Sequence, residues 1–253
     1  MSGELRLESV TCGYGHSAVV QSLSARCPRN VITGMLGANG AGKTTLLRSI
    51  SGYLPLRSGT IHLNGTELSD LSFRDRARHI ACVPQISQDS LPLSVREAVR
   101  MARYPHLKRR LINGGDVFAA VDTAISDMGL IELADRQCST LSGGEWRRVL
   151  IAQGLAQETP VLLLDEPTAF LDPPSRRMIL DRVRGLAQKR NLTVVAVLHD
   201  IDLAAEYCGH ALLLRGGDLL ASGSPADVLS TGNLSQLYDC EPQWLGSEVT
   251  YHA

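Results

Sequence analysis

The feature that most constrains the fold is a glycine-rich segment at residues 37–44, Gly-Ala-Asn-Gly-Ala-Gly-Lys-Thr. It matches the Gly-x-x-x-x-Gly-Lys-[Ser/Thr] pattern of a phosphate-binding loop. The apolar run NVITGMLG at 30–37 leads into it, and the run TTLLRSI at 44–50 that follows favours a helix. The alternative is a glycine-rich turn with an incidental lysine, and the flanking strand and helix count against it. The segment therefore predicts an α/β fold with an anion site at a helix start.

Each residue type in this loop has a physical role. Gly37, Gly40 and Gly42 let backbone N–H groups wrap phosphate oxygens, and the helix start adds partial positive charge. Lys43 supplies a full positive charge to the terminal phosphates, and Thr44 offers a hydroxyl to Mg²⁺. The residues expected to line the phosphates are Gly37, Ala38, Asn39, Gly40, Ala41, Gly42, Lys43, Thr44 and Thr45.

The pattern of the whole chain agrees with such a fold. Residues 5–65 are rich in strand patterns, whereas 94–157 carry apolar residues at helical intervals. From 160 to 223 strand and helix patterns alternate, which predicts a parallel sheet with helices on its faces. The helical block in the middle is interpreted as an insertion into this sheet domain.

Acidic and imidazole groups follow two further apolar strands. Asp165 and Glu166 end the run VLLLDE, and His199 ends the run LTVVAVLH. Ligands of open α/β sheets collect at the carboxyl edge of the strands, so we expect these side chains near the phosphates. Asp165 would hold Mg²⁺, and Glu166 would orient or deprotonate the attacking water. Helix capping by the acids and a structural role for the histidine are the alternatives.

The stretch TLSGGEWRR at 140–148 starts a helix in an unusual way. Ser142 and Glu145 have the spacing of a capping box. Gly143 and Gly144 stand in the first turn, although each glycine costs about 1 kcal/mol relative to alanine inside a helix. The glycines indicate that another group must come close to this backbone.

Composition restricts the partners. The net charge of −1 argues against nucleic acid, and no apolar run approaches the length of a membrane span. Charges at Glu4 and Arg6 are unlike a secretory signal, so a cytosolic chain is expected. The cysteines are widely spaced and are interpreted as reduced thiols of the core rather than metal ligands: Cys12, Cys27, Cys82, Cys138, Cys208 and Cys240.

The ordered motifs resemble the nucleotide-binding subunit of ATP-binding cassette (ABC) transporters over essentially the whole chain. The matching elements are Tyr14 as the adenine-stacking aromatic, GANGAGKT as Walker A, Gln85 in VPQ, LSGGE as the signature, VLLLDE as Walker B, Leu171-Asp172, and His199 as the switch histidine. The chain departs from the family pattern at Glu145, Ala38 and Phe170, and none of these changes removes a catalytic group.

The resemblance implies a P-loop NTPase core with a parallel sheet, an N-terminal antiparallel β subdomain and an inserted α-helical subdomain. Its approximate bounds are 1–88 and 158–253 for the core with the β subdomain, and 89–157 for the helical subdomain, within a single domain 1–253. The implied cofactors are ATP and Mg²⁺. The implied catalytic residues are Glu166, His199, Lys43 and Gln85, and the implied metal ligands are Thr44, Gln85 and Asp165.

The resemblance also implies partners. Two copies pair head to tail, and the signature of one copy covers ATP held by the P-loop of the other, with Ser142, Gly143, Gly144 and Asp172 near the nucleotide. The glycines then let a second helix start reach the phosphates, since a Cβ there is in the way. Two transmembrane permease subunits, and indirectly a substrate-binding protein, complete a transporter, with this chain at the cytoplasmic face of the bacterial inner membrane.

Three short segments, 101–110, 220–229 and 233–241, resemble ATPases of iron-siderophore, haem and vitamin B12 importers. The helical block would move, with Gln85 at its hinge, and residues 86–110 would receive the permease.

Two other functions stay open. One is a soluble cassette ATPase of an assembly complex, as in iron-sulfur cluster biogenesis, and the other is a nucleotide or small-molecule kinase.

Overall fold

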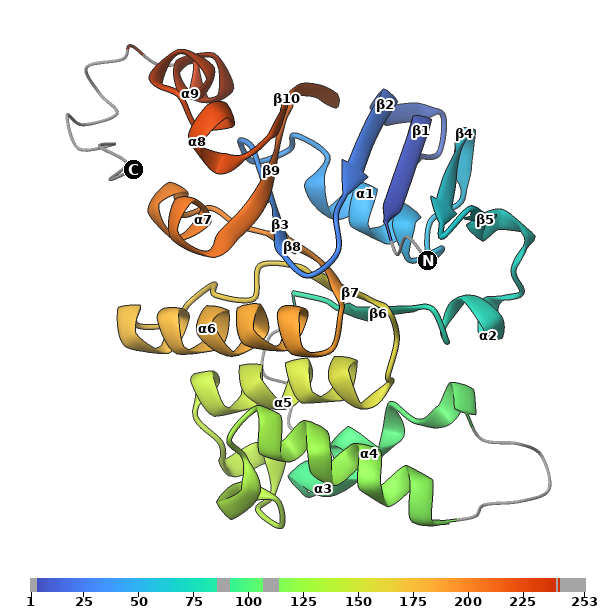
Figure 1. The fold of residues 1–253 in the computed structure, drawn as a ribbon, viewed down its shortest axis with the longest axis vertical. Coiled ribbons are helices and arrows are strands. Elements are labelled where there is room, and N and C mark those ends of the chain that lie inside the picture. Colours follow the sequence, from blue (N-terminus) through green and yellow to red (C-terminus); the bar gives the residue numbers. More distant parts are fainter. Residues whose placement is uncertain (1–3, 86–91, 107–113, 240, 242–253) are drawn as a thin grey trace.

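The computed structural model describes residues 4–85, 92–106, 114–239 and 241 (Figure 1). The opening of the chain forms an antiparallel sheet of β1 (Leu5–Tyr14), β2 (Ser17–Cys27), β4 (Leu56–Leu63) and β5 (Thr66–Glu67), in the order β2-β1-β4-β5. Asn64 and Gly65 both have positive φ and form the turn between β4 and β5, as expected for this dipeptide. The expected antiparallel β subdomain is therefore present.

A second sheet has six strands in the order β10-β9-β3-β8-β7-β6. Its members are β3 (Ile32–Leu36), β6 (Ile80–Val83), β7 (Val161–Leu164), β8 (Thr193–Val197), β9 (Cys208–Arg215) and β10 (Asp218–Gly223). Each pair from β9 through β6 is parallel, and only β10 joins this sheet antiparallel, by pairing with β9. Strands β3, β7 and β8 are buried along their whole length, which explains their nearly continuous apolar sequences.

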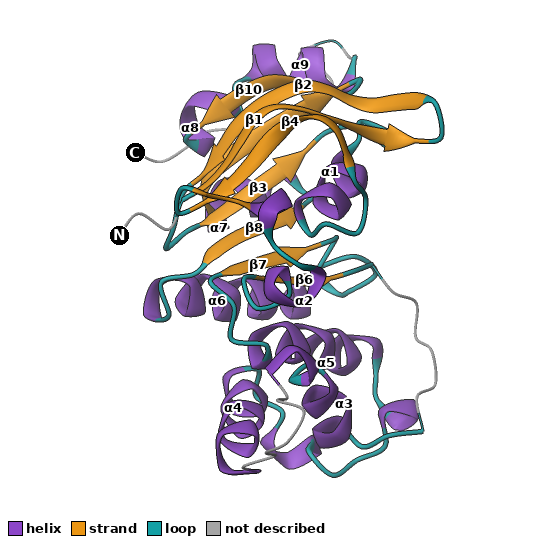
Figure 2. Ribbon diagram, turned by 90° about the vertical axis from the view of Figure 1, so that its right-hand side faces the viewer, coloured by secondary structure: helices purple, strands orange, loops and turns teal. Residues whose placement is uncertain are grey.

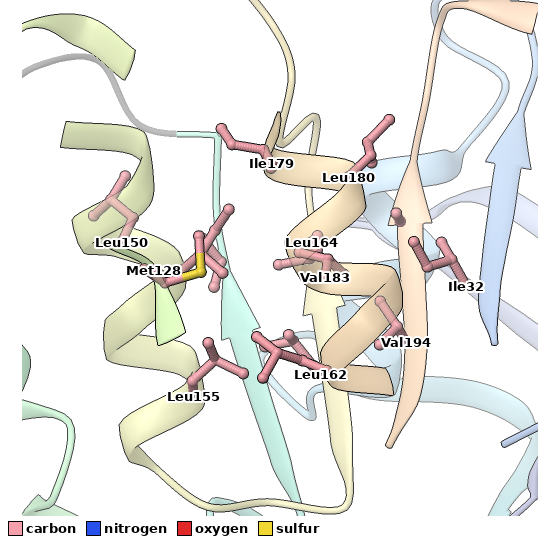
Figure 3. Packing of buried hydrophobic residues seen from close by; sticks show 14 of the residues in the cluster. Ile32, Met128, Leu150, Leu155, Leu162, Leu164, Ile179, Leu180, Val183 and Val194 are labelled. Carbon is pink, nitrogen blue, oxygen red and sulfur yellow. The ribbon is translucent and has the colours of Figure 1, made fainter. Parts of the chain in front are cut away.

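The two faces of this sheet bury different layers. Val161 and Leu163 pack with helix α1 (Lys43–Ile50) and the antiparallel sheet, whereas Leu162 and Leu164 pack with the helices on the other face. Those helices are α5 (Gly143–Ala156), α6 (Pro173–Lys189) and α7 (Ile201–Tyr207). Figure 3 shows the β7 leucines among side chains from α5 and α6. The strand period of two therefore divides one strand between two cores.

A block of helices extends from this second face. It contains α3 (Val95–Met101), α4 (Gly114–Asp127) and α5, which contact one another. Figure 2 shows the block as a separate group below the sheets. All three helices lie within 89–157, and the exact subdomain boundaries stay a prediction. The shorter helices are α2 (Phe73–Arg76), α8 (Pro225–Val228) and α9 (Thr231–Tyr238), with 3₁₀ turns at Leu68–Asp70, Tyr104–His106, Ile131–Leu133 and Cys138–Thr140.

The prediction for the cysteines is partly wrong. Four are buried and free, but Cys82 is exposed: it lies on the edge strand β6, whose other three residues are buried. Cys240 lies outside the described residues. In the part of the chain that the structure describes, no helix has the length and apolar character needed to cross a bilayer.

Candidate active site

The predicted functional groups gather at one edge of the six-stranded sheet. Strands β3, β8, β7 and β6 are parallel neighbours, so their carboxyl ends lie on the same edge. The phosphate loop follows β3, Asp165 and Glu166 follow β7, His199 follows β8 and Gln85 follows β6. This placement confirms the expectation that the strand ends bring these distant segments together.

Two glycines of the loop are required by close packing. A Cβ on Gly37 would lie 2.3 Å from the carbonyl oxygen of Leu214, and one on Gly42 would lie 2.8 Å from Cγ2 of Val20. Gly42 also has φ of 97°, which L-residues with side chains rarely adopt, and it caps the start of α1. The loop can therefore take its course only with glycine at these positions, and α1 begins at Lys43.

Lys43 is held inside its own loop. Its Nζ donates to the carbonyl oxygens of Gly37 at 2.7 Å and Ala38 at 2.9 Å, and the residue is 6% exposed. Burial lowers the pKa of this ammonium group, and the nearby carboxylates of Glu166 and Asp165 act in the opposite direction. The loop thus carries a partly desolvated ammonium group. Among the described residues, the groups that stabilise its charge are two backbone carbonyls and the neighbouring carboxylates, and this environment favours an anionic ligand.

Thr44 and Asp165 meet across the site. The Thr44 hydroxyl donates to Oδ1 of Asp165 at 3.1 Å, which joins the loop after β3 to the end of β7. Burial raises the pKa of Asp165, an effect that the Thr44 hydrogen bond opposes. A hydroxyl and a carboxylate are hard oxygen donors of the kind that Mg²⁺ prefers, so this pair fits the predicted ion.

Glu166 is fixed by two partners from different strands. Nε2 of Gln85 donates to Oε2 of Glu166 at 2.6 Å, and Nε2 of His199 lies 2.7 Å from Oε1. Glu166 has φ of 50°, in the left-handed region that non-glycine residues seldom occupy. Strain of this kind concentrates at functional sites, and here the strained residue carries the carboxylate that contacts Gln85 and His199.

The signature forms the predicted capping box. The Ser142 hydroxyl accepts from the Glu145 N–H at 3.3 Å, and Oε2 of Glu145 accepts from the Ser142 N–H and hydroxyl, both at 2.8 Å. These two donors lower the pKa of Glu145, whose carboxylate is turned back onto its own helix start as expected. In this structure the Ser142 hydroxyl therefore serves as a cap.

The chain itself does not require glycine at the two positions after Ser142. A Cβ on Gly143 would meet nothing within 4 Å, and one on Gly144 would come no closer than 3.6 Å, to Oγ of Ser175. Neither glycine has positive φ. The cause of the two glycines therefore lies outside the packing of this chain, which agrees with the expected approach of a ligand or a second copy.

Two other predicted nucleotide residues have hydrogen-bond partners outside the loop. Tyr14 is the last residue of β1 and is 46% exposed. Its hydroxyl accepts a hydrogen bond from Nη1 of Arg48 at 2.9 Å. Asp172 caps α6 by accepting from the Ser175 N–H at 2.7 Å, which lowers the pKa of its carboxyl. Among the described residues no hydrogen bond joins Asp172 to the phosphate loop, so its role near a nucleotide stays a prediction.

The sequence patterns gave no signal for several arginines around the site. Arg48 and Arg57 both bind the turn that carries Tyr14. Arg147 in α5 is buried, its Nη1 has no hydrogen-bond partner among the described residues, and its charge attracts Glu166 and Asp165. Each was missed because only the folded chain brings it to the site.

Comparisons with known proteins identify the family. Residues 20–169, more than half of the chain, match the family described as ABC transporter. The chain belongs to this family of ATP-binding cassettes. The resemblance deduced from the motifs is confirmed, and so is the expected class of fold.

Curated relatives indicate which kinds of ABC transporter this chain resembles. The chain is 42% identical over 209 residues to the cobalamin import ATP-binding protein BtuD of Halobacterium salinarum, which covers 82% of this chain and 52% of that protein. The chain thus spans about half the length of this relative. It is 35% identical to the ferric enterobactin transport ATP-binding protein FepC of Escherichia coli, with 92% of this chain and 86% of FepC covered. It is 36% identical to the hemin import ATP-binding protein HmuV of Bordetella pertussis, with 94% and 92% covered.

Solved structures of similar fold also come from ABC transporters. CbiO1 of Clostridium perfringens, part of the transporter complex CbiONQ, has a TM-score of 0.82 and 26% identity, covering 93% of this chain and 94% of that one. A putative metal-chelate type ABC transporter in an inward-facing conformation has a TM-score of 0.80 and 28% identity, covering 93% and 88%.

Proposed function

We propose that this chain is the ATP-hydrolysing subunit of an ABC importer that takes up an iron-siderophore, haem or cobalamin-type chelate. One observation carries the chemistry: Glu166 is held between Gln85 and His199 at the strand edge that also bears the phosphate loop. A carboxylate with two fixed neighbours is suited to orient a water molecule and to accept its proton. The names of the curated relatives support the solute class.

The residues of the edge divide the work of phosphoryl transfer. The N–H groups of residues 37–44 and the Lys43 ammonium bind the phosphates, and Glu166 accepts the proton of the attacking water while His199 holds the carboxylate. Thr44, Asp165 and the Gln85 amide would hold Mg²⁺, which supplies charge neutralisation of the terminal phosphates when bound.

The working site needs a second copy of the chain. Gly143 and Gly144 leave the start of α5 without side chains, although no packing contact within the described part of the chain requires it. A helix start with bare N–H groups is an anion site, and one exposed helix end contributes only about 0.3–1 kcal/mol per charge. Capture of ATP therefore belongs to the P-loop, and the signature of the partner copy adds its contribution when a head-to-tail dimer closes.

A surface beside the helical block suits a permease. Phe73 of α2 and Tyr104 are 74% and 75% exposed. The two elements are joined, because Nε of Arg74 and Nε of Arg78 donate to the Pro105 carbonyl at 3.1 Å and 3.0 Å. Residues 86–91 and 107–110 of the predicted docking segment lie outside the described residues. On each of the two copies, one permease subunit would bind here, placing the chain at the cytoplasmic membrane face, with a substrate-binding protein on the other side.

Hydrolysis is tested with Glu166→Gln, with Glu132→Gln as the matched control because Glu132 is exposed on a 3₁₀ turn of the helical block. We expect Glu166→Gln to lower ATP turnover by about 10² to 10⁴, or ~3–5 kcal/mol of barrier, while ATP binding survives and dimers accumulate in light scattering with Mg-ATP. Undiminished turnover removes Glu166 from its role.

The transport role is tested by copurification. The tagged chain, expressed with its neighbouring reading frames and extracted in detergent, should retain an untagged membrane subunit. A soluble partner complex recovered instead would favour the assembly ATPase, and a phosphorylated small-molecule product would favour a kinase.

A further inference from the structure

The turn between β1 and β2 is bound by a single guanidinium group. Nη2 of Arg57 donates to the carbonyl oxygens of Tyr14 at 3.3 Å, Gly15 at 2.6 Å and Ser17 at 3.0 Å. Nη1 of the same side chain donates to the carbonyl of His16 at 3.1 Å. Every carbonyl of residues 14–17 therefore points at one side chain, although Arg57 lies on a different strand.

The strand ladder closes on this turn with the pairs Gly13–Ala18 and Tyr14–Ser17, but it is irregular just before them. The pairing of β1 with β2 has register shifts between Val10 and Cys12 and between Cys12 and Gly13, directly before Tyr14. In the pairing of β1 with β4, Thr11 lies opposite Ser58 and Cys12 opposite Leu56, so the register shift leaves Arg57 between these two pairs with no partner residue in the β1–β4 register. The planar fork of an arginine carries five N–H donors, which lets it gather several carbonyls at once, as a lysine cannot.

The other end of the Tyr14 side chain is held as well. Its hydroxyl accepts from Nη1 of Arg48 at 2.9 Å, and Arg48 belongs to α1, the helix that begins at Lys43 of the phosphate loop. One arginine thus fixes the backbone of Tyr14 and another fixes its hydroxyl. The half-exposed ring is thereby set at a constant place relative to the phosphate loop.

We propose that Arg57 is a positioning residue of the nucleotide site: by clamping the 14–17 turn it holds the Tyr14 ring ready to stack on the nucleobase. This inference rests on the proposed function and extends it to a residue that no sequence motif contains. A ring that is already placed loses less freedom when the base binds, so the clamp contributes to affinity without touching the ligand. The phosphate loop, which Arg57 does not contact, binds the triphosphate as before.

The experiment compares a ligand with a base and one without. Dissociation constants for Mg-ATP and for inorganic tripolyphosphate are obtained from thermal-shift titrations of Arg57→Ala, Arg57→Lys and the native chain. We expect Arg57→Ala to bind ATP about 3- to 10-fold more weakly, within the range that base stacking on an aromatic ring provides, and to bind tripolyphosphate unchanged. Arg57→Lys should fall between. In ATPase assays KM should rise while kcat at saturating ATP stays within about two-fold.

Arg26→Ala is the control, because Arg26 is exposed on β2 of the same sheet at the far end of the β1–β2 hairpin, opposite Arg6. It removes the same charge and should leave both dissociation constants unchanged. Equal weakening of ATP and tripolyphosphate by Arg57→Ala would show a general disturbance of the fold and overturn the proposal.

A double-mutant cycle with Tyr14→Ala separates this inference from the proposed function. If Arg57 acts through Tyr14, the double variant binds ATP no more weakly than Tyr14→Ala alone. Additive losses, or a Tyr14→Ala chain with native affinity, overturn the clamp. If Tyr14→Ala weakens binding and Arg57→Ala does not, only this inference fails. A native chain that binds no ATP contradicts the proposed function itself.

Discussion

Replacing the two signature glycines by alanine should change stability and activity in opposite directions. The positions have ordinary helical backbone and room for a methyl group: beyond their own helix, no atom of the described residues lies within 4 Å of a Cβ on Gly143, and the nearest to one on Gly144 is 3.6 Å away. Alanine is favoured over glycine by up to about 1 kcal/mol per helical position. We therefore expect each variant, Gly143→Ala and Gly144→Ala, to be as stable as the native chain or more stable.

The size of the effect can be stated as a melting temperature. For a chain of this length 1 kcal/mol corresponds to about 2–4 °C, so each nucleotide-free variant should melt between 0 and about 4 °C above the native chain. Gly37→Ala and Gly42→Ala are the matched controls, since the same methyl group would lie 2.3 Å from the Leu214 carbonyl or 2.8 Å from Val20. These two should melt lower than the native chain.

Activity should follow the opposite order in the signature. If a second copy presses its bound phosphates onto this helix start, a methyl group on Gly143 or Gly144 obstructs that approach, and ATPase activity should fall by at least about ten-fold while ATP binding to the P-loop persists. Differential scanning fluorimetry and a phosphate-release assay measure the two quantities. A variant that is more stable and fully active would refute the reasoning, because the glycines would then serve neither the fold nor a ligand.

Three further predictions follow from the site. Lys43→Ala should weaken ATP binding in calorimetry by at least about ten-fold, because it removes the one full positive charge of the loop, and unchanged affinity would contradict that role. Asp165→Asn should raise the melting temperature of the nucleotide-free chain at neutral pH. The pKa of Asp165 is raised in the folded chain, so the ionised carboxylate lowers the stability of the fold at pH values above the pKa of the unfolded chain. The gain in melting temperature should vanish as the pH falls below the pKa of the unfolded chain. A gain that persists at low pH would have another cause. Ser142→Ala should cost about 1 kcal/mol of stability through the lost cap, whereas Glu145→Gln should cost less than about 0.5 kcal/mol because glutamine also completes a capping box; urea unfolding distinguishes them.

Features that depend on neighbouring residues could be predicted from the sequence. The capping box at Ser142 requires only residues three apart, and the loop after β3 requires a strand, glycines and a helix in order. The meeting of Glu166 and His199 was also accessible, because parallel strands place their carboxyl ends on one edge. The sequence could predict that they are near one another, but not that Gln85 completes the set with a hydrogen bond to the same carboxylate.

Features that depend on the assembled sheet order were out of reach. Cys82 looked like a core residue because its strand is apolar, but β6 lies at the sheet edge and Cys82 is exposed there. Arg57 stands between Leu56 and Ser58 in an ordinary exposed strand, with nothing in the local pattern to relate it to a turn more than 40 residues earlier. Contacts of this type follow from strand order, which local sequence patterns do not encode.

The hydrogen bond between Gln85 and Glu166 would connect the proposed chemistry with the predicted movement of the helical block. Gln85 is the last described residue before the chain runs toward α3 of the helical block, and its amide nitrogen donates to the carboxylate that we propose as the base. An amide has an oxygen as well as this nitrogen, so the same side chain can hold Glu166 and still offer an oxygen ligand to Mg²⁺. A displacement of the helical block that pulls on Gln85 therefore acts on both proposed catalytic components at once. Gln85→Ala should therefore uncouple hydrolysis from docking. ATP still binds to the phosphate loop, but the rate of its hydrolysis no longer changes when a partner docks against the helical block.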